Sequence, residues 1–372
     1  MTGSPPFETT GSARPTIGIV GAGVMGAGIA EVALEAGSEV VLHDVYPEAI
    51  ERAREAIRLG LERRAARLEV NADSIEAWTA ERLGRLRDAH TLDVIANEAE
   101  LVVEAAIEDL GLKHEIFRAL DAGTRDDTIL SSNTSALSIE AIASATTRPT
   151  RVLGLHFFNP VPRMALVEVI PGPLTAPEVV SRAEDVVRAW GKTPIRSTDS
   201  PGFIVNRVNR PFTIEALRLL EAGEATVEAI DKAMRDADFP MGPFELMDLT
   251  GIDVTLAAAR GVWEGLGRPD RLRPSDIQEG LVAQGRLGRK TGSGFYDYTD
   301  GRRGSVSAQF RLAAGESSMP AADIEADILA AIADEARRAV ADGVATEADI
   351  DLALRLGAGH PAGPFERRAA DA

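Results

Sequence analysis

The sequence predicts an α/β N-terminal domain of the doubly wound type, then an all-α C-terminal domain and a truncated helical repeat of it. Three observations support this fold class. Short apolar segments alternate with helical ones through the first 200 of the 372 residues, helical periodicity dominates residues 205–298, and residues 335–366 repeat the pattern of 215–245. We expect a flexible tail at 1–14, the doubly wound domain at 15–200, the helical domain at 201–300, a linker at 301–320 and the partial, degenerate repeat at 321–372.

The composition is that of an ordinary soluble globular protein, with 45% hydrophobic and 26% charged residues. A formal net charge of −18 argues against nucleic acid as a partner, because phosphate backbones need a basic surface. The absence of cysteine excludes disulfides and thiolate metal sites, and we expect no metal. No apolar run reaches the roughly 18 residues of a membrane span, and the opening segment lacks the apolar core of a signal peptide. We therefore expect a cytoplasmic protein.

A glycine loop separates the first expected strand from the first expected helix. Residues 16–20 are apolar enough for a buried strand and lead into the motif GAGVMG, which an Ala-rich helical segment follows. Gly21 would permit the tight turn, Gly23 the close approach of a pyrophosphate to the backbone, and Gly26 the close packing of helix on strand. In this context the motif predicts a Rossmann-like dinucleotide-binding domain. We expect cofactor contacts at Gly21, Gly23, Val24, Met25 and Gly26.

An acidic residue, Asp44, ends the second expected strand, residues 39–44. Its carboxylate can accept hydrogen bonds from the ribose hydroxyls and would repel a 2′-phosphate. The next residues, Val45 to Pro47, supply no arginine to bind such a phosphate. The sequence therefore predicts NAD as the cofactor in preference to NADP.

Further apolar segments continue the alternation. Residues 48–95 are interpreted as a charged helical excursion, and residues 101–104 and 128–132 as strands with helical segments between and after them. Such alternation predicts a parallel sheet that binds its ligands at the carboxyl ends of the strands. Ser135 lies just beyond one of these ends, where a small hydroxyl residue suits the edge of a ligand site. The alternative interpretation is that it belongs to a turn or helix cap.

One of the five histidines, His156, lies in the apolar segment LHFFNP near the end of an expected strand, residues 151–158. A histidine in such a segment is commonly a hydrogen-bonded core residue, but it could also act as a general base. Glu168 is the only charge in the next expected strand, residues 166–170, and a buried carboxylate there needs a partner. The pattern favours His156 as a base that Glu168 orients. Asn206, at the start of the helical half, could bind a substrate oxygen.

Together these motifs resemble the L-3-hydroxyacyl-CoA dehydrogenase family over residues 17–298. The segments GAGVMG, SNTS, LHFFNPVP, LVEVI, PGFIVNR, FPMGPFELMD and GRKTGSGFYDY occur in the family order. The resemblance implies His156 as the catalytic base, Glu168 as its orienting partner, and Ser135 and Asn206 as ligands of the substrate's oxygens. It also implies that Glu108, Lys113, Ser135, Asn159 and Lys290 line the nicotinamide and phosphate side of NAD. One departure is Ala165, where many relatives carry a lysine, and this bears on substrate preference.

The function that follows is reversible NAD-dependent oxidation of an L-3-hydroxyacyl-CoA to the 3-oxoacyl-CoA, as in fatty acid β-oxidation or short-chain acyl-CoA metabolism. The resemblance implies an acyl-CoA substrate and a homodimer formed through the helical domain. Two alternatives stay open. One is an NAD-dependent dehydrogenase of a hydroxy acid or sugar acid without CoA, and the other is a non-catalytic NAD-binding protein.

The repeat at the C-terminus has lost the catalytic residues. The position equivalent to Asn206 is Ala326, and no second glycine loop precedes it. We therefore expect the copy to serve packing. Either it caps the dimer surface within one chain or it extends the dimer interface, and the sequence does not choose between these.

Overall fold

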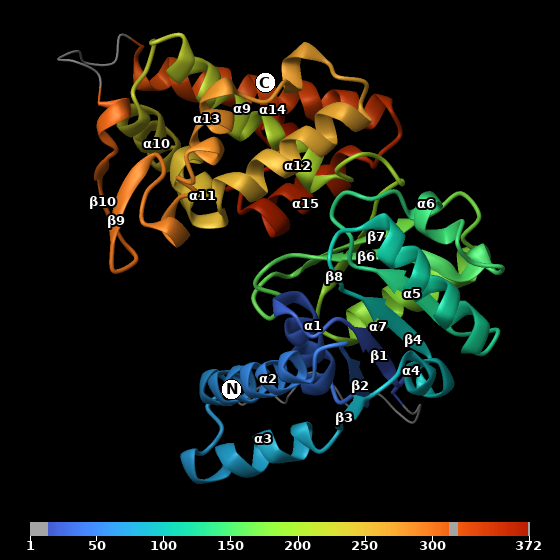
Figure 1. The fold of residues 1–372 in the computed structure, drawn as a ribbon. Coiled ribbons are helices and arrows are strands. Elements are labelled where there is room, and N and C mark those ends of the chain that lie inside the picture. Colours follow the sequence, from blue (N-terminus) through green and yellow to red (C-terminus); the bar gives the residue numbers. More distant parts are fainter. Residues whose placement is uncertain (1–13, 312–318, 371–372) are drawn as a thin grey trace. The chain divides into compact units, whose positions relative to one another are not determined.

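The computed structural model describes residues 14–311 and 319–370, and its contacts divide the chain into two compact units (Figure 1). The first unit comprises Met1–Thr134 and Ile139–Pro194, and the second comprises Ser135–Ser138 and Ile195–Ala372. Of the expected tail, residues 1–13 lie outside the described residues, as do residues 312–318 of the expected linker.

An eight-stranded sheet forms the centre of the first unit. Its strand order is β3-β2-β1-β4-β5-β6-β7-β8; the strands from β3 to β6 pair in parallel and β7 is antiparallel to β6. This order confirms the doubly wound fold class. The strands are β1 (Ile17–Val20), β2 (Val40–His43), β3 (Leu86–Ala89), β4 (Leu101–Glu104), β5 (Ile129–Ser132), β6 (Val152–Phe157), β7 (Leu166–Pro171) and β8 (Thr193–Arg196).

Helices pack against both faces of this sheet and bury its central strands on both sides. Ile17 and Ile19 of β1 belong to the same hydrophobic core cluster as Ile29 of α1. Gly18, between them, faces the other way, where an added Cβ would lie 2.7 Å from Ile95 of α4. The helices are α1 (Val24–Glu35), α2 (Pro47–Arg67), α3 (Ile75–Leu83), α4 (Leu92–Glu98), α5 (Leu110–Gly123), α6 (Ile139–Ala143) and α7 (Pro177–Ala189), with short 3-10 turns η1 (Ala72–Ser74) and η2 (Pro149–Arg151).

Two segments differ from the expectation. The excursion at residues 48–95 is not wholly helical, because β3 lies within it as the edge strand next to β2. The expected linker contains a strand, β10 (Arg302–Val306), which pairs with β9 (Tyr296–Thr299) in a two-stranded antiparallel ribbon. Both missed strands are edge strands with exposed polar residues, so neither has the continuous apolar run of a central strand.

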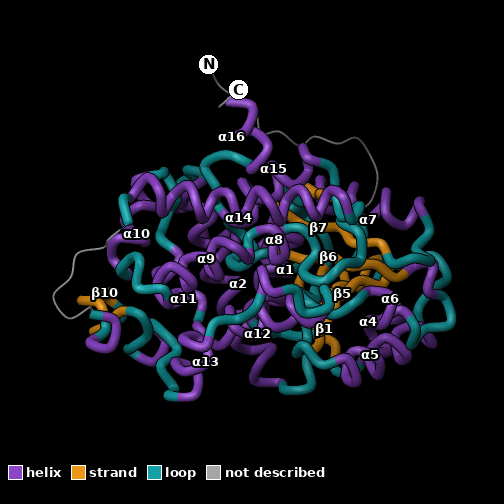
Figure 2. Tube along the Cα trace, turned by 90° about the horizontal axis from the view of Figure 1, so that it is seen from above, coloured by secondary structure: helices purple, strands orange, loops and turns teal. Residues whose placement is uncertain are grey.

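The second unit is mainly helical, as expected. In the view from above, its helices appear as purple coils and the ribbon of β9 and β10 as a short orange segment (Figure 2). Its helices are α8 (Val205–Val208), α9 (Arg210–Glu221), α10 (Val227–Asp236), α11 (Pro243–Thr250), α12 (Ile252–Gly265), α13 (Asp276–Ala283), α14 (Ala321–Ala341), α15 (Glu347–Ala358) and α16 (Pro364–Ala370), with 3-10 turns η3 (Asp270–Leu272), η4 (Arg289–Thr291) and η5 (Ala308–Phe310).

The helices α14, α15 and α16 reproduce local details of α9, α10 and α11. The buried Asp231 on α10 accepts backbone hydrogen bonds from the first turn of α11, at 2.9 and 3.2 Å. Asp351 on α15 accepts the equivalent pair from α16, at 2.9 and 3.1 Å. Thr226 and Thr346 cap α10 and α15 in the same way. The copy therefore keeps the framework contacts of the first helical set.

Within residues 14–311 and 319–370, no helix is both long and apolar enough to cross a membrane. The same residues contain no group of three or more His, Cys, Asp or Glu side chains that could hold a metal ion.

Candidate active site

The glycine loop connects β1 to α1 at the carboxyl edge of the sheet. Gly21 has φ +106°, a conformation that favours glycine, and an added Cβ there would lie 2.6 Å from the backbone oxygen of Ala105. At Gly26 an added Cβ would lie 1.8 Å from the backbone oxygen of Gly21, so helix and loop pack without room for a side chain. Gly23 differs, because an added Cβ would meet nothing within 4 Å. The loop is thus closed on its protein side and open at Gly23.

The N-terminus of α1 is suited to an anion. Its N-cap, Gly23, has no side chain to cap the free N–H groups, and the first turn contains no acidic residue. Exposed apolar side chains occur close in sequence to the carboxyl ends of these strands: Val24 begins α1, Val45 and Tyr46 follow β2, and Ile107 follows β4, and they are 63% to 76% exposed. An open backbone cradle, a helix N-terminus and exposed apolar side chains together fit a dinucleotide.

Asp44 lies directly after β2 and is held beside this loop. One carboxylate oxygen accepts the Ala22 N–H at 2.8 Å, and the other accepts the Tyr46 N–H at 3.0 Å. The side chain is only partly buried. Its fixed place next to the glycine loop is the one that a ribose-binding carboxylate requires.

His156 and Glu168 form a hydrogen-bonded pair across β6 and β7. The two residues are directly opposite in the antiparallel register, and His156 Nδ1 lies 2.6 Å from Glu168 Oε2. His156 is 6% exposed and Glu168 is fully buried. Since a carboxylate only accepts, the hydrogen of this bond lies on Nδ1. The Phe158 ring lies 4.5 Å from the imidazole and limits its movement. The pairing foreseen from the lone charge in β7 is present.

A second polar cluster lies at the carboxyl ends of β4 and β5. Lys113 is 1% exposed, and its Nζ donates to both oxygens of the buried Glu104, at 2.7 and 2.8 Å. Glu108 lies 3.4 Å from the same ammonium group and accepts the Thr134 hydroxyl at 2.6 Å. The structure thus brings together Glu108 and Lys113, which the family resemblance assigns to the cofactor. Their contact with NAD stays a prediction.

Three further residues hold this part of the first unit in place, and none of them was assigned to catalysis or to the cofactor from the sequence. Glu104 compensates Lys113 as described, and the side chain of Asn133 accepts the Phe157 N–H at 2.8 Å, joining the ends of β5 and β6. Lys192 Nζ donates to the backbone oxygens of Val161 and Met164, at 2.6 and 2.8 Å, and so fixes the loop that follows β6. A charged residue at the end of an apolar strand was the available signal for Glu104. The two partners of Lys192 are backbone carbonyls, and these cannot be recognised from residue types in the sequence.

The other predicted site residues are distributed between the units. Asn159 is exposed, directly after β6 in the first unit. In the second unit, the Asn206 side-chain nitrogen lies 3.4 Å from the Ser135 backbone oxygen, so these two predicted substrate ligands are neighbours. Lys290, also in the second unit, pairs with Asp253 at 2.6 and 2.7 Å. Its assignment to the cofactor stays a prediction.

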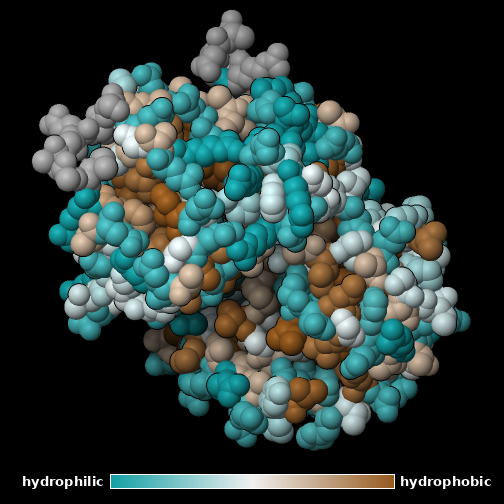
Figure 3. All heavy atoms as spheres, turned by 45° about the horizontal axis from the view of Figure 1, so that its top comes forward, coloured by the Kyte–Doolittle hydropathy of each residue, from teal (hydrophilic) through white to brown (hydrophobic). Residues whose placement is uncertain are grey.

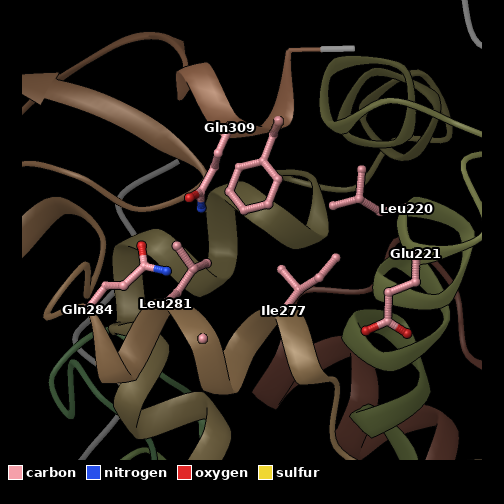
Figure 4. Close-up of a pocket in the computed structure, with 8 residues that line it drawn as sticks. Leu220, Glu221, Ile277, Leu281, Gln284 and Gln309 are labelled. Carbon is pink, nitrogen blue, oxygen red and sulfur yellow. The ribbon is translucent and has the colours of Figure 1, made fainter. Parts of the chain in front are cut away.

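A surface hollow of about 500 Å³ lies in the second unit, among α9, α13 and η5 (Figure 4). In the close-up, side chains from α9, α13 and η5 surround this space, and the space-filling view shows apolar areas in brown among the polar surface (Figure 3). No predicted catalytic or cofactor residue lines it, so it is separate from the candidate site. Its lining residues are Leu220, Glu221, Ile277, Gly280, Leu281, Gln284, Gln309 and Phe310.

Comparison with known proteins agrees with this geometry. The NAD-binding domain of 3-hydroxyacyl-CoA dehydrogenase matches residues 16–200, and the C-terminal domain of the same family matches residues 202–298 and 324–368. The chain is 45% identical to 3-hydroxyadipyl-CoA dehydrogenase of Escherichia coli over 79% of its length, but this match spans only 61% of that relative. It is 44% identical to the mitochondrial hydroxyacyl-coenzyme A dehydrogenase of Rattus norvegicus, over 75% of this chain and 90% of the relative.

Among solved structures, 3-hydroxybutyryl-CoA dehydrogenase from Escherichia coli is similar over 96% of this chain and 91% of its own, with a TM-score of 0.85 and 37% identity. The long matches to both family domains confirm the family and the NAD cofactor that the motifs predicted. The chain belongs to the 3-hydroxyacyl-CoA dehydrogenase family of NAD-dependent oxidoreductases.

Proposed function

We propose that the chain oxidises an L-3-hydroxyacyl-CoA reversibly to the 3-oxoacyl-CoA, with NAD as the acceptor. The observation that carries this proposal is the pair of His156 and Glu168 on β6 and β7, in the same unit as the dinucleotide loop. The names of relatives with 44% and 45% identity support the acyl-CoA substrate.

His156 acts as the general base. Its Nε2 takes the proton of the substrate's 3-hydroxyl group, and the resulting imidazolium is stabilised by the buried carboxylate of Glu168. Bound NAD supplies the acceptor for the hydride that leaves C3. In the reverse direction the imidazolium returns the proton to the oxygen of the 3-oxo group. Such general base catalysis contributes about 10²–10⁴-fold to the rate.

Ser135 and Asn206 bind the substrate's oxygens in this proposal. Both are polar groups near the surface of the second unit, and their neighbouring positions support a shared role. The contribution expected from them is orientation of the substrate and stabilisation of charge at the developing carbonyl. Glu108, Lys113, Asn159 and Lys290 are proposed as cofactor contacts on the family resemblance.

The direct test is NADH consumption by the purified chain with acetoacetyl-CoA, and with free acetoacetate as the matched substrate without CoA. Turnover of the CoA ester alone is the expected result. Turnover of the free acid at an equal rate would favour the alternative, a dehydrogenase of hydroxy acids or sugar acids. A protein that binds NADH and reduces neither compound would contradict the proposal.

We also propose a homodimer in the cytoplasm, acting in β-oxidation or short-chain acyl-CoA metabolism. The lack of cysteine is compatible with a reducing compartment. Support for self-association through the helical unit comes from Leu249 and Val254, apolar residues that are 49% and 51% exposed. Sedimentation analysis at micromolar concentration tests the dimer, and a monomer there would contradict it.

A further inference from the structure

We propose that the partial second copy, helices α14 to α16, positions Asn206 by clamping the short helix α8 that carries it. The inference rests on the proposed function, in which Asn206 binds a substrate oxygen. We use the name clamp residues for Glu335, Asp342 and His360, which belong to the second copy and contact the residues one and three positions after Asn206.

The first clamp contact is made to Arg207, the residue directly after Asn206. The Arg207 side chain is 1% exposed; its Nε donates to Glu335 at 2.8 Å and its Nη2 to Asp342 at 2.5 Å. Glu335 is also 1% exposed and accepts a second guanidinium, from Arg271, at 2.6 Å. A buried charge needs accurately placed partners, because each lost partner leaves an uncompensated ion. The ion pairs therefore fix Arg207 tightly against α14.

The second clamp contact is made to Asn209, at the junction of α8 and α9. Its side-chain oxygen accepts a hydrogen bond from His360 Nε2 at 2.8 Å. His360 is 6% exposed, and its ring packs edge-on against Phe239 at 4.9 Å and near Phe212 at 6.3 Å. Burial lowers the pKa of His360 to about 3, so the ring is neutral at physiological pH and donates from one nitrogen. Asn209 is thereby tied to the loop between α15 and α16.

The helix α8 is too short to be stable on its own. The helix has only four residues, far fewer than an isolated helix needs for stability. The turn before it contains Gly202 and Phe203, both with positive φ, at +79° and +50°. For a phenylalanine this conformation is uncommon and requires support from the surroundings. The position of Asn206 therefore depends on contacts that flank it, and the clamp residues supply those on its C-terminal side.

The second copy has no residue that could act in place of Asn206. At the equivalent position it carries Ala326, while its capping contacts through Asp351 and Thr346 are retained. The second copy thus retains its structural hydrogen bonds but lacks the side-chain amide, which is consistent with a role in positioning other residues and not in catalysis. The clamp residues are thus positioning residues.

The test compares kinetics of full-length variants. H360L removes the donor to Asn209 but keeps an apolar side chain against the phenylalanines, and D342N removes the charge of the more exposed partner of Arg207. We expect the double variant to lose about tenfold in kcat/KM for acetoacetyl-CoA, as two hydrogen bonds are weakened. The dissociation constant of NADH should stay unchanged, because neither His360 nor Asp342 contacts the glycine loop or Lys290. H360Q, which restores a donor, should recover part of the loss.

The matched control is D334N. Asp334 lies on α14, the helix that Asp342 directly follows, and its carboxylate accepts from Arg337 and Arg338 of the same helix. This variant should keep wild-type kinetics. The decisive comparison repeats H360L and D342N in the N206A background, where the losses should disappear because no amide is left to position. Wild-type kinetics in the double variant, or equal losses with and without Asn206, would overturn the clamp.

Hydrogen exchange distinguishes a failure of the clamp from a failure of the proposed function. The backbone amides of residues 205–209 should exchange faster in the double variant than in D334N. If the wild-type chain does not reduce acetoacetyl-CoA, the proposed function fails, and faster exchange in these residues still supports the clamp. Unchanged exchange contradicts the clamp, whatever the activity.

Discussion

At the scale of single residues, the pair of His156 and Glu168 is the feature on which the proposed chemistry depends. Replacing His156 by glutamine keeps the polarity and approximate size of the side chain but removes the base. We expect kcat/KM for the acyl-CoA to fall by about 10²–10⁴-fold. The affinity for NADH, measured by fluorescence titration, should stay within twofold or so of the wild-type value, because a lost proton acceptor is not a lost cofactor contact.

Glu168→Gln is the matched variant for this test. The amide keeps the shape of the side chain but cannot stabilise an imidazolium as a carboxylate does. The kcat/KM of E168Q for the acyl-CoA should therefore also fall, but by a smaller factor than that of H156Q. Full activity in either variant would show that another group takes the proton.

A second prediction at this scale concerns Arg210 at the start of α9. It is 8% exposed, and its Nε has no hydrogen-bond partner among the described residues. Burial lowers the pKa of its guanidinium to about 10. A buried charge without a partner is unfavourable, so R210M should raise the free energy of unfolding by about 1–3 kcal/mol.

Urea denaturation measures this effect, with R337M as the control. Arg337 is 50% exposed and pairs with Asp334 of its own helix, and its replacement should change stability by no more than about 0.5 kcal/mol. A less stable R210M would contradict the prediction. A stable R210M that loses activity would identify Arg210 as a ligand of an anionic substrate group.

At the scale of elements, two substitutions in the loop between β1 and α1 test cofactor binding and folding separately. G23A adds a methyl group that meets no atom within 4 Å, so the fold should stay intact while the dissociation constant of NADH rises about tenfold or more. G26A places its methyl group against the Gly21 oxygen, at 1.8 Å, and should destabilise the fold itself. Calorimetry and thermal unfolding measure the two effects. Normal NADH affinity in G23A would contradict a cofactor site at this loop.

The elements also show how far the sequence alone could predict the structure. The central strands were predictable because they are continuous apolar runs, and β4 has the expected bounds, Leu101–Glu104. The strand β3 was missed because its middle residues, Arg87 and Asp88, are exposed and charged. The strand β10 has four exposed residues and lies in a stretch that composition marks as a linker.

The candidate site was predictable from the sequence where the residue pattern within a single segment indicates a functional side chain. A lone carboxylate in an apolar strand indicated that Glu168 needs a partner, and the antiparallel return of β7 supplies His156. The contact of Arg207 with Glu335 was not predictable, because the two residues are 128 positions apart and belong to different helical sets. Ion pairs between distant segments follow from packing, and a single sequence contains no periodic signal for them.

At the scale of the whole molecule, buried carboxyl groups in both units determine the pH dependence of stability. Burial raises the pKa of Glu31 in the first unit to about 7, and in the second unit it raises that of Asp231 to about 7 and that of Asp248 to about 6. In the unfolded chain these groups have values near 4. Between about pH 4 and 7 these three groups bind more protons in the folded state than in the unfolded state, so they make stability fall as pH rises. The lowered pKa of His360 acts in the opposite direction, but it is a single group against three.

We expect the free energy of unfolding to decrease by on the order of 1–3 kcal/mol between pH 5 and pH 8. Urea denaturation across this range measures the change. D231N should make the decrease smaller, because an amide cannot titrate. A stability that rises over the same range would contradict the shifted values. Below this range the sign reverses, because hydrogen bonds outweigh burial at Asp121 and lower its pKa to about 2, so its contribution is lost on acidification.

The antiparallel pairing of β6 with β7 has a consequence for changes in chain length. Successive residues of a strand face opposite sides of the sheet, so inserting one residue within β7 ahead of Glu168 would turn its carboxylate to the far side from His156. Residues 158–165, between the strands, do not follow this alternation, but contacts of Phe158 with His156 and of Lys192 with Val161 and Met164 hold them in place. A change of chain length is therefore least tolerated inside β7, where a shift by one residue would separate the acid from its histidine.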